Sequence, residues 1–185
     1  EINKKELGEN IHNQVIGWTE NCDTKAYIMI AFIGIFASIL FTSDFILESL
    51  QKLIFPIFIY WKTGQGRFSL LSMFVFLSLS ASLFFLGWCI LLLFDSLSGK
   101  TVCSEDSLLF FGKIQHNSNF QSFYEKFDTI TEGELLKDRL RQIYNCSKRC
   151  ADKFRSYNKA ILMAKLAVLS LCLFMISLLV FNSIS

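Results

Sequence analysis

The chain has 185 residues, of which 52% are hydrophobic and 15% aromatic, and its formal net charge is +2. Three runs contain no charged residue: Ala26–Ser43, Phe68–Phe94 and Leu166–Ser185. A soluble domain of this length has no core that could bury three such runs, and each run is close to the length that a helix needs to cross about 30 Å of hydrocarbon. The composition therefore excludes most soluble enzymes and predicts an all-α integral membrane protein with three transmembrane helices.

Residues 1–25 are predicted to form a cytosolic amphipathic helix that runs directly into the first span. Apolar residues recur there at steps of three and four, which is the period of one helix face. The predicted apolar stripe consists of Leu7, Ile11, Val15, Trp18 and Cys22.

Residues 26–94 are predicted to hold the first two transmembrane helices and, between them, a helix that lies in the membrane interface. The charged residues of this linker are four apart and share one face, while apolar residues cover the rest. We predict that Pro56 ends the linker helix. A re-entrant element that lines a pore is the alternative. The polar face and the expected aromatic anchor are Asp44, Glu48 and Lys52, and Tyr60-Trp61-Lys62.

Serines are the informative residues of the second span. Ser78 and Ser82 are four apart, a spacing of small residues that lets helices approach closely in lipid. Ordinary helix packing is one interpretation of these hydroxyls. The more specific interpretation is that Ser78, Ser80 and Ser82 line a conduction path.

Residues 95–160 are predicted to form a cytosolic helical segment. It begins with an apolar patch, Ser107–Ile114, expected to dock on the cytosolic bundle or the bilayer surface. Aromatic residues at helical spacing then predict a short helix that buries its rings: Phe120, Phe123, Tyr124 and Phe127. Thr131 and Glu134 have the spacing of a capping box. No Pro or Gly follows Glu134, so one helix is expected to run on through the third span, at 161–185.

The cytosolic half of this long helix carries a heptad seam, in which apolar residues step alternately by four and three. A sustained period of 3.5 favours helix-on-helix packing, within or between protomers. From it we predict a homo-oligomer, most plausibly a tetramer. The residues chosen for the oligomer seam are Leu136, Leu140, Ile143 and Phe154.

The distribution of Lys and Arg predicts the orientation in the membrane. The N-terminal tail and the segment 95–159 together carry fourteen of these residues, against three in the linker between the first two spans. By the positive-inside rule, the N-terminus and residues 95–160 face the cytoplasm.

A basic cluster lies between Lys137 and Lys159, where eight basic residues stand against two acidic ones. One interpretation is contact with anionic lipid next to the membrane. The other is a phosphate site for a nucleotide or oligonucleotide. The candidate nucleotide-binding residues are Lys25, Arg141, Lys148, Arg149 and Lys153.

No catalytic motif appears in the sequence. His12 and His116 have no metal-ligand spacing to each other, and Cys146 and Cys150 lack two further zinc ligands. We therefore expect neither an enzyme nor a bound metal or other cofactor.

Short motifs resemble a known family. They are Trp18…Asp23-Thr-Lys-Ala26 before the first span, Ser107–Ile114 after the second, and Gln142-Ile-Tyr144…Lys153 before the third. Together they resemble bacterial membrane effectors of the cyclic-pyrimidine antiphage (Pycsar) type, whose wider relatives are SLATT-like effectors of nucleotide-signalling defence operons.

The resemblance implies an effector in the bacterial inner membrane that is coupled to a nucleotide-synthesising enzyme of the same operon. Such an effector oligomerises and permeabilises the membrane during infection. The resemblance leaves open whether the ligand is a cyclic mononucleotide, another second messenger or an oligonucleotide. The alternative function is a non-conducting membrane scaffold that recruits a partner through its heptad seam.

Overall fold

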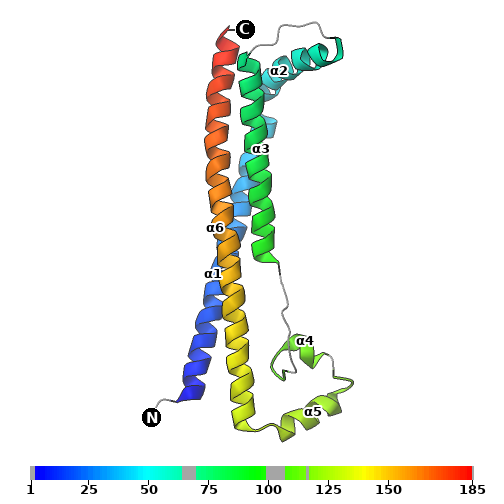
Figure 1. The fold of residues 1–185 in the computed structure, drawn as a ribbon, viewed down its shortest axis with the longest axis vertical. Coiled ribbons are helices and arrows are strands. Elements are labelled where there is room, and N and C mark those ends of the chain that lie inside the picture. Colours follow the sequence, from blue (N-terminus) through cyan, green and yellow to red (C-terminus); the bar gives the residue numbers. More distant parts are fainter. Residues whose placement is uncertain (1–2, 64–69, 99–106, 116, 185) are drawn as a thin grey trace. The chain divides into compact units, whose positions relative to one another are not determined.

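The computed structural model describes residues 3–63, 70–98, 107–115 and 117–184. These ranges are helical and contain no strand (Figure 1). Three of the helices, α1, α3 and α6, are long and apolar enough to cross a membrane. The predicted class, an all-α membrane protein, is therefore confirmed. The helices are α1 (Lys4–Thr42), α2 (Asp44–Thr63), α3 (Leu70–Leu97), α4 (Phe111–Ile114), α5 (Phe120–Thr129) and α6 (Glu132–Ile184).

The chain divides into two compact units. Unit 1 consists of residues 1–24 and 96–155, and unit 2 of residues 25–95 and 156–185. Helices α1 and α6 contribute residues to both units without a break in either helix. The spans therefore continue the same helices that build unit 1.

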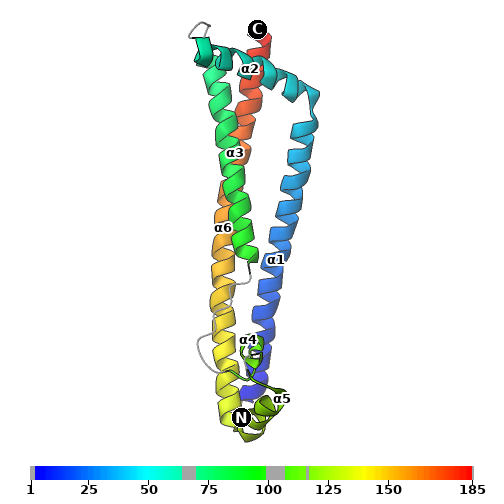
Figure 2. The ribbon, with the colours of Figure 1, turned by 90° about the vertical axis from the view of Figure 1, so that its right-hand side faces the viewer.

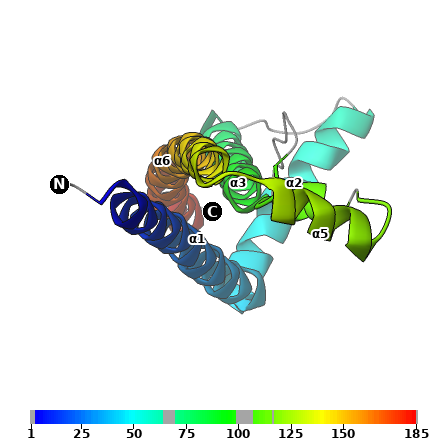
Figure 3. The ribbon, with the colours of Figure 1, turned by 90° about the horizontal axis from the view of Figure 1, so that it is seen from below.

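In unit 1, α1 and α6 lie side by side and run parallel (Figures 1 and 2). Ion pairs join Glu9 to Arg139 and Asp23 to Lys153, and the partners are 130 residues apart in both pairs. The two ion pairs lie two heptads apart along each helix, and the difference in residue number between the partners is the same in both. This is the geometry of two parallel helices in register. Helices α4 and α5 lie beside the unit 1 part of α6, to its right in Figure 1 where α1 lies to its left, and Figure 3 shows α5 on a different flank of α6 from α1.

The buried face of α1 in unit 1 differs from the predicted stripe. Val15 and Cys22 are buried as predicted, at 3% and 0% exposure, but Trp18 is 57% exposed. The face toward α6 instead steps by seven residues through Gly8, Val15 and Cys22. Gly8 belongs to it because a Cβ there would lie 4.0 Å from Cδ1 of Ile143. The other residues of the predicted stripe are exposed: Leu7, Ile11 and Trp18.

Unit 2 packs α2, α3 and α6 around a small apolar core. Its fully buried members are Leu53, Val75, Phe174 and Leu178. Two hydrogen bonds connect the helices: Ser82 Oγ donates to the carbonyl oxygen of Ala167 at 3.3 Å, and Asn182 Nδ2 donates to Ser49 Oγ at 2.8 Å. In lipid, such small and polar contacts hold helices together where the hydrophobic effect does not.

The linker helix α2 is longer than predicted. It runs from Asp44 through Pro56 to Thr63, so the expectation that Pro56 ends the helix was wrong. A proline removes one backbone hydrogen bond from a helix. The other turns keep theirs, and a helix is the conformation that satisfies a backbone in an apolar environment.

Helix α5 forms where the aromatic spacing predicts it, but it does not bury the rings. The Asn119 side chain caps its start by accepting a hydrogen bond from the Ser122 amide at 2.8 Å. No residue of α5 is buried, and Phe120, Tyr124 and Phe127 are exposed. The spacing of the rings was sufficient to predict a helix, whereas burial required a partner surface that the described residues do not provide for α5.

The start of α6 confirms the predicted capping box. The Glu134 amide donates to Thr131 Oγ1 at 3.3 Å. In return, the Thr131 amide and hydroxyl donate to Glu134 Oε2 at 3.0 and 2.7 Å. These two donors, the amide first, lower the pKa of the Glu134 carboxyl.

This carboxyl gives a pH dependence to the first turn of α6. Folding lowers the pKa of Glu134, so the ionised carboxylate stabilises the folded state. This stabilisation is present above the ordinary pKa near 4.5 and is lost as the pH falls through the lower pKa of the folded protein. We expect hydrogen exchange at the first turn to be slow at pH 7 and to accelerate, relative to intrinsic rates, below about pH 4.5. Glu134→Gln should show less of this acceleration, and an identical pH profile in both proteins would contradict the assignment.

Candidate functional site

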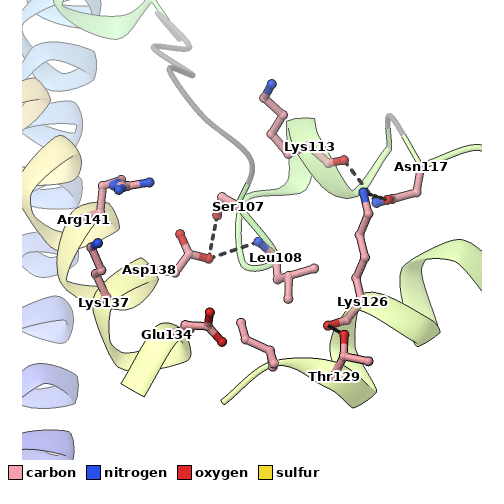
Figure 4. A pocket seen from close by; sticks show the side chains of 11 residues that line it. Ser107, Leu108, Lys113, Asn117, Lys126, Thr129, Glu134, Lys137, Asp138 and Arg141 are labelled. Atoms are coloured by element: carbon pink, nitrogen blue, oxygen red, sulfur yellow. Dashed lines mark hydrogen bonds between the residues drawn. The ribbon is translucent and has the colours of Figure 1, made fainter. Parts of the chain in front are cut away.

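A basic pocket opens in unit 1 between α6 and the segment that contains α4 and α5 (Figure 4). Its volume is about 420 Å³, within the range of small-molecule sites. Four basic side chains and two carboxylates line it together with polar groups. The charged lining residues are Lys113, Lys126, Lys137, Arg141, Glu134 and Asp138, and the polar ones include Ser107, Asn117 and Thr129.

Asp138 joins the pocket to the fold of unit 1. Its Oδ2 accepts hydrogen bonds from Ser107 Oγ at 2.9 Å and from the amides of Leu108 and Leu109 at 3.0 and 3.3 Å. Ser107 Oγ also accepts from Gln142 Nε2 at 3.3 Å. The segment after the second span therefore docks on α6, which is one of the two placements expected for it.

Gly112 shapes the same segment. A Cβ on this residue would lie 2.6 Å from the ring of Phe110, a distance that requires the ring to move. The glycine thus allows α4 to turn tightly under Phe110. This close approach places the Lys113 side of α4 next to the pocket.

The pocket has an excess of positive charge. Lys126 Nζ donates to Asn117 Oδ1 at 2.9 Å, which fixes one ammonium at the wall opposite α6 (Figure 4). Of the two carboxylates, Glu134 is engaged with Thr131 through Oε2. Asp138 is engaged as well, through Oδ2. Four basic side chains against two carboxylates that already accept hydrogen bonds suit an anion such as a phosphate.

The structure separates the predicted nucleotide-binding residues. Arg141 lines the basic pocket. Lys153 instead donates to both carboxylate oxygens of Asp23, at 2.5 and 2.8 Å. Lys148 is exposed and Arg149 half-buried, and Lys25 is an exposed residue of unit 2.

Sequence reasoning missed most of the pocket. Lys113, Lys126 and Asp138 come from three segments, and only their packing brings them together. The one available signal was the motif Ser107–Ile114, in which a lysine follows an apolar run that docks on α6. The nucleotide site was predicted instead at the basic cluster on α6, because the residues of that cluster are close together in the sequence.

The residues of the oligomer seam have different environments. Ile143 is buried at 7% exposure, so it is used within the chain in the α1–α6 pair. Leu140 is 49% exposed, and Leu136 and Phe154 are half-buried. The prediction of a seam between protomers therefore depends on Leu140 and its half-buried neighbours.

The serines of α3 fall on two faces. Ser78 and Ser82 are buried, and Ser82 Oγ bonds to α6 as described above. Ser80 is exposed, and its hydroxyl donates to the carbonyl oxygen of Phe76 at 2.9 Å. The conduction path over all three hydroxyls stays a prediction, and Ser80 alone lies on the outer face of α3 in a single chain.

The motifs that carry the family resemblance contact one another in unit 1. Asp23 of the first motif pairs with Lys153 of the third, and Ser107 of the second bonds to Gln142 of the third. Next to Asp23, the Cys22 thiol is fully buried, and burial raises its pKa. Cys22 is therefore a protonated packing residue rather than a reactive thiolate.

Within the part of the chain that the structure describes, no group of three or more His, Cys, Asp or Glu side chains is arranged to hold a metal ion.

Comparison with known proteins gives the same family as the motifs. The model of the Pycsar effector protein domain matches residues 7–181. The Pycsar effector protein GmPycTM of Gulbenkiania mobilis is 35% identical over 159 residues, which cover 78% of this chain and 77% of that protein. No solved structure matches the chain. The predicted resemblance is confirmed.

Proposed function

This chain belongs to the Pycsar effector family, transmembrane proteins of antiphage defence, and we propose that it permeabilises the inner membrane under the control of a nucleotide second messenger. The observation that carries the nucleotide part is the basic pocket of unit 1. Its four cations suit a phosphate, and its volume suits one small ligand rather than a long oligonucleotide. A cyclic mononucleotide, made by a nucleotide-synthesising enzyme of the same operon, is the ligand that we propose.

Control would reach the membrane through the helices themselves. The pocket is built on α6, and α6 is paired with α1 by the two ion pairs. Both helices continue without a break into spans. A ligand that shifts α6 against its neighbours in unit 1 therefore needs no separate gate domain, because small helix shifts are a common form of switching.

Permeabilisation would require several copies. In the most apolar 18-residue stretch of α1, only 6% is buried within the described structure. The corresponding stretches of α3 and α6 are 22% buried. A span with so little intramolecular packing offers its surface to a second copy or to lipid. We propose a homo-oligomer, most plausibly a tetramer, with the N-terminus and unit 1 in the cytoplasm.

Lysine variants of the pocket test the nucleotide part. We expect Lys113→Gln and Lys126→Gln each to weaken binding of 3′,5′-cyclic UMP or CMP by roughly tenfold or more, the usual weight of a hydrogen bond to a charged group. Lys148→Gln is the matched control, because Lys148 is an exposed lysine of α6 outside the pocket. Isothermal titration of the full chain in detergent measures all four proteins. Equal affinities would place the ligand elsewhere.

The scaffold alternative has one observation in its favour. Phe120, Tyr124 and Phe127 expose three rings on α5, a surface that suits a partner protein. In that case the membrane potential of expressing cells would stay intact.

A further inference from the structure

An apolar pocket of about 420 Å³ lies in unit 2 between α1, α2, α3 and α6. Three of its walls are residues 29–41 of α1, 79–86 of α3 and 164–174 of α6, and residues 46–50 belong to α2, which crosses one end of the other three helices (Figure 2). Ser82 is the one polar side chain among the described residues that line it, and its hydroxyl already donates to the carbonyl oxygen of Ala167. The pocket therefore suits an apolar ligand.

The pocket exists because α1 packs closely only at the beginning of its span. Ala26 of α1, Leu93 of α3 and Ala160 of α6 are fully buried. After Ala26, no residue of α1 up to Thr42 is buried. The gap between α1 and the other helices of unit 2 is therefore left for something other than the described side chains to fill.

The surroundings of the pocket are hydrocarbon rather than water. Its α1 and α3 walls belong to the uncharged runs 26–43 and 68–94. Lining residues on three helices are exposed, so the pocket is open at the surface of unit 2: Phe36, Leu83 and Val168. Water in such a cavity would need two to four polar partners, and an empty cavity would cost its walls their dispersion contacts. Lipid is the apolar material that can enter from the membrane.

The size of the pocket distinguishes an acyl chain from a helix of a second copy. The α1 and α6 walls are about 15–18 Å long at 1.5 Å per residue, so the volume corresponds to a mean cross-section of about 25 Å². A helix with its side chains is about 10–12 Å wide and would need about 80–110 Å². A straight hydrocarbon chain needs about 16–20 Å², because non-bonded carbons approach to about 4 Å. The pocket has room for one chain and excludes a helix.

We propose that this pocket binds one acyl chain of a membrane phospholipid, and that the bound chain packs α1 against α3 and α6 in unit 2. The apolar lining recognises the chain and not the headgroup, so phospholipids with different headgroups should bind alike. The inference is independent of the proposed nucleotide site and of the pore.

The first test counts the phospholipid that stays on the protein. The full chain is purified in digitonin, whose rigid steroid body is wider than a straight acyl chain, and the phospholipid bound to each protomer is measured by mass spectrometry. We expect the wild type to retain one phospholipid for each protomer. Ala37→Trp should lose it, because Ala37 lines the pocket and an indole there occupies the space of the chain.

Ala31→Trp is the matched control, because Ala31 is an exposed residue of the same helix outside the pocket. This variant should retain phospholipid like the wild type. Retention by Ala37→Trp at the wild-type level would overturn the proposal. A wild type that retains no phospholipid, together with an oligomer that dissociates only in Ala37→Trp, would assign the pocket to a second copy instead.

A second test uses the wild type alone and so does not depend on the folding of a variant. Delipidated protein in digitonin is titrated with palmitoyl-oleoyl phosphatidylglycerol, palmitoyl-oleoyl phosphatidylethanolamine and diphytanoyl phosphatidylglycerol, and its melting temperature is measured. We expect the two straight-chain lipids to raise the melting temperature equally and the diphytanoyl lipid to raise it much less, because its methyl branches widen the chain. Equal stabilisation by straight and branched chains would contradict the narrow pocket. A large difference between the two headgroups would contradict recognition through the chain.

Discussion

Replacing Ile143 with aspartate is expected to separate α1 from α6 in unit 1. Ile143 is 7% exposed and packs next to Gly8, so a carboxylate there is buried without a partner. Such a charge costs about 3–5 kcal/mol, a large part of the usual stability of a domain. Circular dichroism of the protein in detergent should show a fall in the melting temperature of more than about 10 °C. Limited proteolysis should then cut within residues 132–155.

Leu140→Asp is the matched control, because Leu140 belongs to the same heptad seam but is 49% exposed. The melting temperature of this variant should fall much less than that of Ile143→Asp, because an exposed carboxylate has little burial cost. If Leu140 lies between protomers, mass photometry should show a tetramer for the wild type and a monomer for the variant. Equal melting of Ile143→Asp and wild type would contradict the α1–α6 pair, and a wild-type monomer would contradict the oligomer.

Loss of membrane potential is the second large effect that we expect. Cells that express the wild type together with the proposed nucleotide-synthesising partner should depolarise on infection before phage lysis, as a potential-sensitive dye reports. Ser80→Leu should abolish this depolarisation at unchanged expression. Ser80 is a hydroxyl on the exposed face of α3, and polar groups within a span are rare and commonly functional.

Ser80→Thr keeps the hydroxyl and should depolarise like the wild type. Ser82→Leu is a less informative variant, because Ser82 contacts the backbone of α6 and its loss disturbs packing. If cells that express Ser80→Leu depolarise at the wild-type rate, Ser80 does not line the conduction path. If cells that express the wild type keep their membrane potential until lysis, the pore function is contradicted and the scaffold function is favoured.

The ion pair between Asp23 and Lys153 shows how far sequence reasoning reached. In the sequence, Asp23 stood out only as part of a motif before the first span, and Lys153 was predicted to bind a nucleotide. The fold joins the two instead. Sequence shows that both charges lie near the ends of spans, but it does not show the register of two helices 130 residues apart. A Lys153→Glu variant therefore perturbs helix pairing and is a poor probe of ligand binding.

The sequence by itself determined the features that depend on neighbouring residues. The spans, the capping box at Thr131 and the uninterrupted helix to Ile184 follow from local hydrophobicity, side-chain hydrogen bonds and the absence of Pro and Gly. These forces act over one or two helical turns, so a linear pattern contains them. The family followed as well, since its motifs are short and contiguous.

Only the tertiary structure decided which face of each helix is buried and where the ligand site lies. Helix α1 has apolar residues on two adjacent stripes, and packing against α6 buries the one through Gly8, Val15 and Cys22, where Gly8 faces the side chain of Ile143. The pocket needed α4, α5 and α6 together, because each contributes only part of its charge. Asp138 joins the pocket to the fold only because a segment about thirty residues earlier in the sequence donates three hydrogen bonds to its Oδ2. Long-range packing sets these properties, and no local pattern encodes them.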